Sequence, residues 1–178
     1  MAITKVSPDL LDLDAGITIS VADNSDNLTL TSTDADANSG PNLRMYRNSS
    51  SPADSDAIGL IDFEGKNDAG SPEDIVYAAI DTRIVDASDG TEDGRIEIAT
   101  ILAGTAGVSR VLMDATETVF NDNSKDLDFR VESDNDANAF FVQGSNGSIG
   151  LGTGSPLQRC SFHKYTYVEH NPSCLRPS

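Results

Sequence analysis

The chain has 178 residues with 29 acidic and 12 basic side chains, and its formal charge is -17. This balance excludes a protein that binds nucleic acid through a basic surface, because phosphate contacts need clustered Lys and Arg. It also disfavours contact with an anionic membrane surface. Ile, Leu, Val and Phe make up about 23% of the residues, only slightly above the roughly 20% below which a highly charged chain is expected to be disordered. A compact monomer would therefore have a thin core.

The bias among the acidic residues predicts the class of secondary structure. Asp outnumbers Glu 22 to 7. Glu favours helices whereas Asp favours caps and turns, and Asp, Asn, Ser, Thr and Gly together make up nearly half the chain. These residues are typical of turns and short polar strands, so we expect an all-β protein.

Residues 1–15 contain a short helix-compatible piece, 8–14, with Ser7 as a possible N-cap, and Gly16 would end it. We expect a short N-terminal segment that is helical or extended. No apolar run resembles a signal peptide or reaches the ~18 residues of a membrane helix. Synthesis and assembly in a cytoplasm, without membrane insertion, are therefore expected.

The next segment changes to a period of two. Ile17, Ile19 and Val21 alternate with small polar residues, and residues 28–31 follow a polar turn. This pattern predicts a hairpin or two successive strands. A third strand is predicted over 43–47, between loops.

Further strands are predicted at a spacing of about 8 to 12 residues, which is typical of an all-β array. The long segment 74–85 has no amphipathic helical stripe, so it is also interpreted as a strand. The predicted strands are 57–64, 74–85, 95–102, 108–113, 116–120, 127–132 and 139–143.

The clearest alternation occupies 127–132, where Leu127, Phe129 and Val131 point one way and three charged residues point the other. One face of such a strand has to be buried, because an exposed apolar face is an association site. Since the chain has little other apolar surface, we expect several copies to bury these faces together. An elongated homotrimer does this economically, with each chain forming one wall of a shared core.

Two stretches have the alternate oxygen ligands of a calcium loop. Both lack the Gly and the bidentate Glu of an EF-hand, because Ser39 and Met45 stand at those places in the first stretch and Ala139 and Ser145 in the second. Polar turns are therefore favoured. The stretches are Asp34-x-Asp36-x-Asn38 and Asp134-x-Asp136-x-Asn138.

The glycine-rich run 144–154 lacks the ending of a phosphate-binding loop and precedes no helix pattern, so it predicts a tight turn and a closely packed strand. Carboxylates are so frequent that no pair of them indicates glycoside hydrolysis. No catalytic, cofactor-binding or metal-binding residue is assigned, and no cofactor is expected.

The composition changes after Pro156. Residues 157–178 hold three basic residues, one acidic residue, both cysteines and both histidines. Cys160, His163, His170 and Cys174 offer the four ligands of a tetrahedral zinc site, but the loop between the histidines is short and no scaffold is evident. A flexible or loosely docked tail is favoured, and a disulfide or a partner contact remains an alternative.

The order of several blocks resembles a module of bacteriophage tail fibres and related virion fibres, especially those of marine and cyanobacterial phages. The blocks 61–70, 76–80 and 86–97 are similar to one part of that module. The blocks 119–122, 127–134 and 148–156 look like a repeat that precedes further fibre segments. Together the matches span roughly residues 40 to 156.

The resemblance implies a slender trimeric β-structured appendage of a virion, on the tail or the capsid, that is not an enzyme and contributes to host-cell attachment. Its partners would be further copies, other virion proteins, and a glycan or protein of the host surface. In this interpretation 1–15 is an attachment segment, 16–156 is the β-rich fibre body, and 157–178 is a tail that departs from the family.

Two alternatives remain. The first is a virion-associated tailspike that degrades polysaccharide, although the chain has no Trp and only ten Phe and Tyr residues to form sugar platforms. The second is a subunit of a bacterial extracellular adhesin or filament, although no secretion signal is evident.

Overall fold

The computed structural model describes residues 16–156. The chain divides into two compact units, 1–44 and 45–178. The expected attachment segment 1–15 and the tail 157–178, with Cys160, His163, His170 and Cys174, lie outside the described residues.

The strands predicted over 17–21, 28–31 and 43–47 are wrong, because the described backbone from 16 to 56 forms no strand. Residues 16–44 are exposed throughout. The amide of Asn27 donates to the carbonyl of Ile19 (2.7 Å), and the Ser25 N–H donates to Asp23 (2.9 Å). An alternating pattern becomes a strand only when a neighbouring strand pairs with it.

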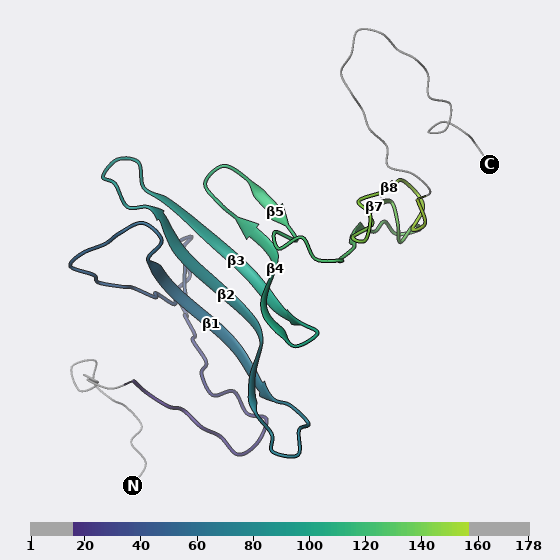
Figure 1. The fold of residues 1–178 in the computed structure, drawn as a ribbon. Coiled ribbons are helices and arrows are strands. Elements are labelled where there is room, and N and C mark those ends of the chain that lie inside the picture. Colours follow the sequence, from purple (N-terminus) through teal and green to yellow (C-terminus); the bar gives the residue numbers. More distant parts are fainter. Residues whose placement is uncertain (1–15, 157–178) are drawn as a thin grey trace. The chain divides into compact units, whose positions relative to one another are not determined.

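The all-β class is confirmed for the described residues, which contain strands and no helix (Figure 1). No helix among them is long and apolar enough to cross a membrane. Five strands form one antiparallel sheet in sequence order, and three short strands form a second antiparallel sheet. The strands are β1 (Ala57–Lys66), β2 (Asp74–Asp86), β3 (Asp93–Leu102), β4 (Thr105–Met113), β5 (Thr118–Phe120), β6 (Phe129–Val131), β7 (Phe140–Val142) and β8 (Ile149–Gly150).

The long segment 74–85 is a strand, as predicted, and forms most of β2. The reversal between β3 and β4 occurs at Ala103 and Gly104, which both have positive φ (46° and 80°), as a two-residue hairpin of the primed type requires. β4 therefore begins at Thr105, three residues before its predicted start, and Gly107 (φ 68°) lies inside the strand.

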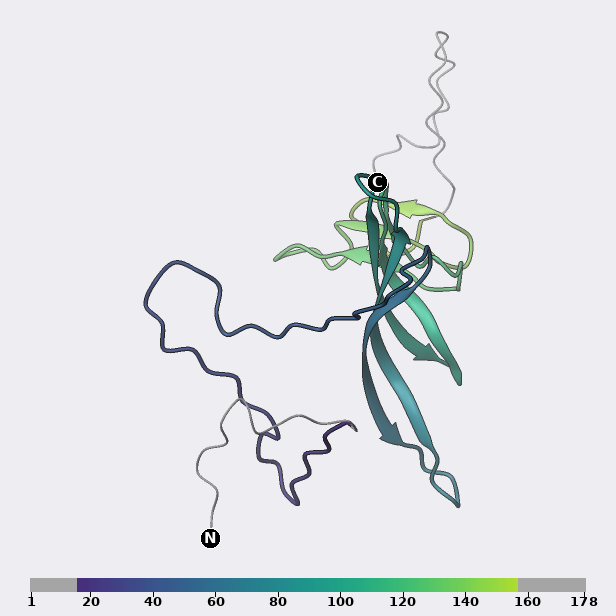
Figure 2. The ribbon, with the colours of Figure 1, turned by 90° about the vertical axis from the view of Figure 1, so that its left-hand side faces the viewer.

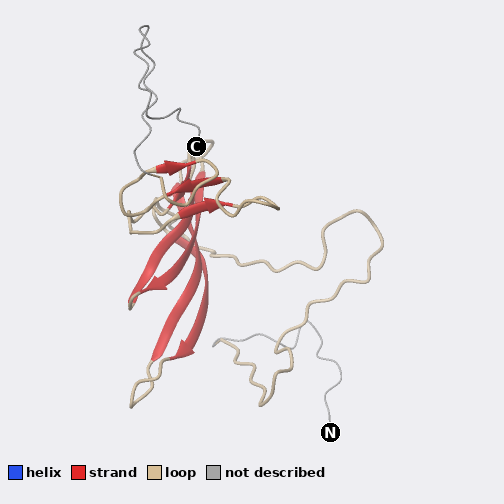
Figure 3. Ribbon diagram, turned by 90° about the vertical axis from the view of Figure 1, so that its right-hand side faces the viewer, coloured by secondary structure: helices blue, strands red, loops and turns tan. Residues whose placement is uncertain are grey.

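The five-stranded sheet is a single layer (Figures 2 and 3). Four hydrophobic side chains are buried in the described part of the chain: Ala99, Val108, Leu112 and Phe141. Three of them lie on β3 and β4, where the segment after β5 folds back. There the Asn123 side chain accepts the Ser109 N–H (2.6 Å), and the Asn121 N–H donates to the carbonyl of Arg110 (3.2 Å).

Aromatic side chains and close backbone contacts hold the smaller sheet. Phe129 lies 4.8 Å from Phe120 and 6.1 Å from Phe140 between ring centroids. Val131, which was predicted to share a buried face with Phe129, is 48% exposed. At Gly144 and Gly150, a Cβ atom would overlap the backbone of Leu127 and Thr153. The prediction of a closely packed glycine-rich strand is therefore confirmed.

Candidate functional site

One face of the five-stranded sheet carries no charged residue in its cross-strand rows. Residues directly paired in neighbouring antiparallel strands point to the same side of a sheet, so the register defines the rows. We call this surface the uncharged face. Its rows are Ile84–Gly94, Gly59–Thr82–Ile96–Met113–Thr118, Ile61–Ile80–Ile98–Val111–Phe120 and Phe63–Ala78–Thr100–Val108.

Large apolar side chains of the uncharged face are accessible to solvent. Phe63 is 55% exposed and Phe120 is 51% exposed, and Ile61, Ile98 and Met113 are each exposed by 38 or 39%. Contiguous exposed apolar surface of this kind marks association sites in soluble proteins.

The opposite face carries charged residues, and two arginines among them form ion pairs within the chain. Asp81 lies across from Glu97, and Arg83 lies across from Arg95. Each arginine forms an ion pair along its own strand, Arg83 with Asp81 (2.7 Å) and Arg95 with Glu97 (3.9 Å). The hydrogen bond to Asp81 raises the pKa of Arg83 above its ordinary value. The charged part of this face is suited to contact with water, whereas its part on β3 and β4 holds the buried residues Ala99, Ser109 and Leu112.

A bulge in β4 sets the margin of the uncharged face. Val111 pairs with Ile98 and Ser109 pairs with Ala99, so Arg110 has no counterpart in β3. The Arg110 Nε donates to the hydroxyl of Thr100 (2.6 Å). A cation therefore stands beside one end of the apolar rows.

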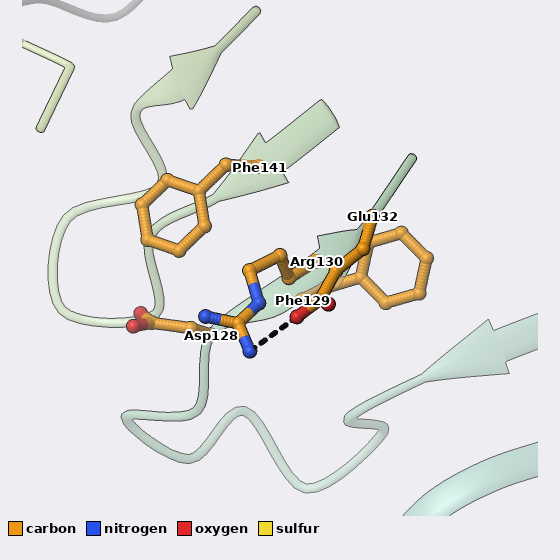
Figure 4. A pocket seen from close by; sticks show the side chains of 5 residues that line it. All are labelled: Asp128, Phe129, Arg130, Glu132 and Phe141. Carbon is orange, nitrogen blue, oxygen red and sulfur yellow. Dashed lines mark ion pairs between the residues drawn. The ribbon is translucent and has the colours of Figure 1, made fainter. Parts of the chain in front are cut away.

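A second candidate site is a cleft in the smaller sheet with a volume of about 580 Å³ (Figure 4). Its lining residues are Asp128, Phe129, Arg130, Glu132 and Phe141. Arg130 forms an ion pair with Glu132 (2.6 Å), and Asp128 accepts the N–H of Gly144 (2.9 Å). Phe141 is buried and provides an apolar floor. Polar groups of both charges around an apolar floor can hold a neutral polar ligand through hydrogen bonds.

The two stretches with calcium-like spacing form polar turns. Asp36 accepts the N–H of Asn38 and Asp136 accepts that of Asn138, each at 2.8 Å. This side chain to backbone bond two residues along the chain is an Asx turn. The hydrogen bond from Asn38 lowers the pKa of Asp36. Within residues 16–156, no three His, Cys, Asp or Glu side chains are grouped as metal ligands would be.

The sequence pointed to the alternation at 127–132 and missed the larger apolar surface on β1 to β5. The signal was present, since Ile61 and Phe63, or Ile96 and Ile98, have the same period of two. What the sequence lacked was the register that places these pairs on one side.

Comparison of the chain with protein-family models, with curated proteins and with solved structures found no match. The function has to be argued from the sheet and the cleft.

Proposed function

We propose that the chain is a structural, non-enzymatic subunit of a bacteriophage virion fibre, that it acts as a homotrimer, and that it contributes to host attachment. The observation that carries the proposal is the single-layered five-stranded sheet, with so few buried hydrophobic side chains. A stable domain usually needs a second layer to cover the apolar side of its sheet. Further copies of the same chain provide that layer.

The resemblance to fibre proteins supports the proposal because one part of it falls on this sheet. The blocks 61–70 and 76–80 include parts of β1 and β2, and the block 86–97 includes the loop between β2 and β3. One part of the resemblance thus falls on the incomplete layer, and the blocks 127–134 and 148–156 fall on the smaller sheet.

The charge of the chain suits a long appendage. A formal charge of -17 keeps such a particle soluble and makes assembled fibres repel one another. Acidic side chains on the loops and on the opposite face would face solvent in this arrangement, while apolar residues are shared among the copies.

The cleft in the smaller sheet is our candidate for host contact. Its polar groups and apolar floor suit a glycan, which offers hydroxyl groups and apolar ring faces. A hydrolase would need two carboxyl groups across the scissile bond. Here Glu132 is engaged by Arg130, and Asp128 is engaged by the Gly144 amide, which favours adhesion over the tailspike alternative.

Substitution of the cleft arginine tests this contact. On a panel of surface polysaccharides, Arg130→Ala should weaken binding by about 10-fold or more, because a charged hydrogen-bond donor is lost. Arg47→Ala is the matched control, since Arg47 is also paired with a carboxylate, Asp56 (3.1 Å), but lies outside the cleft. Equal binding by the wild type and Arg130→Ala would remove the cleft from the proposal.

Electron microscopy of the purified full-length chain tests the fibre itself. We expect uniform slender particles of limited length. The average of their images should show three-fold symmetry. Compact single-chain particles would contradict the proposal, and open-ended filaments would favour the adhesin alternative.

A further inference from the structure

We infer that copies of this chain pack against one another through the uncharged face of the five-stranded sheet. The inference rests on the proposed homotrimer and adds the surface that forms it. Its occupant is a second copy of the chain.

Charge selects this face over the opposite one. The rows of the uncharged face contain only apolar residues, Gly and Thr. The opposite face presents Asp62, Asp81 and Glu97 together with two arginines. Copies of a chain with a formal charge of -17 repel each other wherever carboxylates meet, and burial of an ion pair is often no better than leaving it in water. Contact through the uncharged face brings no carboxylates together, and the cation at its margin, Arg110, already donates to Thr100.

The edges of the sheet are poor alternatives. The edge strand β1 pairs irregularly with β2, because the register shifts between positions Ala57 and Gly59 and again between positions Phe63 and Glu64. Asp62, Glu64 and Lys66 add charges to that strand. Bulges and charges are devices that prevent strand addition at an edge. The other edge strand, β5, has only three residues.

The size of the uncharged face matches what a specific contact needs. Five strands about 4.8 Å apart give a width of about 24 Å, and the seven residues from Ala78 to Ile84 give a length of about 23 Å. The footprint is therefore about 500 Å² per copy. A contacting pair would bury about 1,000 Å², which is the lower range of specific interfaces.

A second copy fits this face better than a different partner does. Apolar sheets pack face to face about 10 Å apart, and each copy brings the same rows of side chains. Exposed aromatic residues stand at both sides of the face, Phe63 on β1 and Phe120 on β5. In a closed ring of copies each of these side chains becomes covered by a neighbour.

Two adjacent residues of β1 provide a matched pair of variants. Ile61 lies on the uncharged face and is 39% exposed, whereas Leu60 lies on the opposite face and is 52% exposed. Ile61→Glu should weaken association by about 100-fold or more, because the interface would bury an unpaired charge. Leu60→Glu should keep the mass of the wild type. Sedimentation velocity measures both, and circular dichroism checks that the strands are retained.

A photo-crosslinking residue gives an independent readout that does not add a charge. p-Benzoylphenylalanine in place of Phe63 retains an aromatic side chain, and on illumination its ketone forms a carbon–carbon bond with a nearby C–H group and becomes an alcohol. We expect products of two and three chains from this position. The same probe at Leu60 should give single chains.

The outcomes separate the inference from the proposed function. If the wild type assembles and the two Glu variants behave alike, both assembled or both dissociated, the inference is wrong. The proposed fibre would be unaffected by that result. If Ile61→Glu fails to fold, absence of intermolecular products from position 63 would overturn it. A product within one chain would assign the face to another segment of the same chain. A wild type that is monomeric at all concentrations would contradict the proposed function itself.

Discussion

At Ser109, one group of a buried residue stabilises the fold through Asn123, and another group destabilises it. Ser109 is fully buried in β4. Its N–H donates to the Asn123 side chain, but its hydroxyl has no hydrogen-bond partner among the described residues. An unsatisfied buried polar group is costly, whereas its removal is neutral or favourable.

Two substitutions therefore have opposite expected effects. Ser109→Ala removes the unpartnered hydroxyl and should leave the unfolding temperature unchanged or raise it. Asn123→Ala leaves the Ser109 N–H without its acceptor and should lower the free energy of unfolding by about 1–3 kcal/mol. Urea unfolding followed by circular dichroism measures both. An equal loss in the two variants would show that the hydroxyl has a partner after all.

Gly144 is needed for close approach of two backbone segments. A Cβ atom there would overlap the backbone of Leu127, whereas one at Gly70 would meet nothing within 4 Å. Gly144→Ala should cost about 1–3 kcal/mol of stability, as overpacking usually does. Gly70→Ala is the control and should change the unfolding temperature little. A Gly144→Ala protein as stable as the control would mean that 144–154 is loosely packed.

At the scale of the element, Asp86 organises the loop between β2 and β3. The Ser88 N–H donates to Asp86 (2.8 Å) and the Thr91 hydroxyl donates to it as well (3.1 Å). These bonds lower the pKa of Asp86 below its ordinary value of 3.8, and the bond from the Ser88 N–H is the largest cause. A carboxyl group whose pKa is lower in the folded state stabilises the fold above its unfolded pKa. That contribution disappears as the pH falls through the folded pKa.

Asp86→Asn should therefore unfold at a lower temperature than the wild type above about pH 5, with the difference shrinking below about pH 4. Thermal unfolding measured from about pH 2 to about pH 7 checks the trend. A difference that stays constant with pH would rule out titration of Asp86 as its cause.

Strands were predictable where an alternating pattern had a neighbour in the chain to pair with. The segments 57–64, 74–85 and 95–102 alternate and are separated by short polar turns, so each can fold back onto the one before it. The segments 17–21 and 28–31 also flank a polar turn, yet neither forms a strand, because an isolated two-stranded hairpin is at best marginally stable. Pairing depends on the rest of the fold, which a local pattern does not contain.

The surface that we assign to assembly was only partly predictable, for the same reason. The thin core predicted that several copies of the chain share one apolar face. Which face it is depends on register, and the register shifts where Arg110 is inserted and between Phe63 and Glu64. A shift of one residue exchanges the two faces of a strand. The sequence singled out 127–132, which supplies most of the residues around the cleft, but it did not predict the cleft, because Phe141 of β7 completes the lining.

At the scale of the whole molecule, the thin core and the acidity have one explanation. The five-stranded sheet presents an uncharged side and a charged side, on which Arg83 and Arg95 are each paired with a carboxylate of their own strand. Association through the uncharged side completes the core without bringing carboxylates together. In the proposed fibre, the chain would complete its core only as part of the assembly.

The most direct test of this account is the mass of the full-length protein in solution, measured by sedimentation equilibrium over a range of concentrations. The account predicts a single species of three times the chain mass of 18.8 kDa. A well-folded species of 18.8 kDa at every concentration would contradict it.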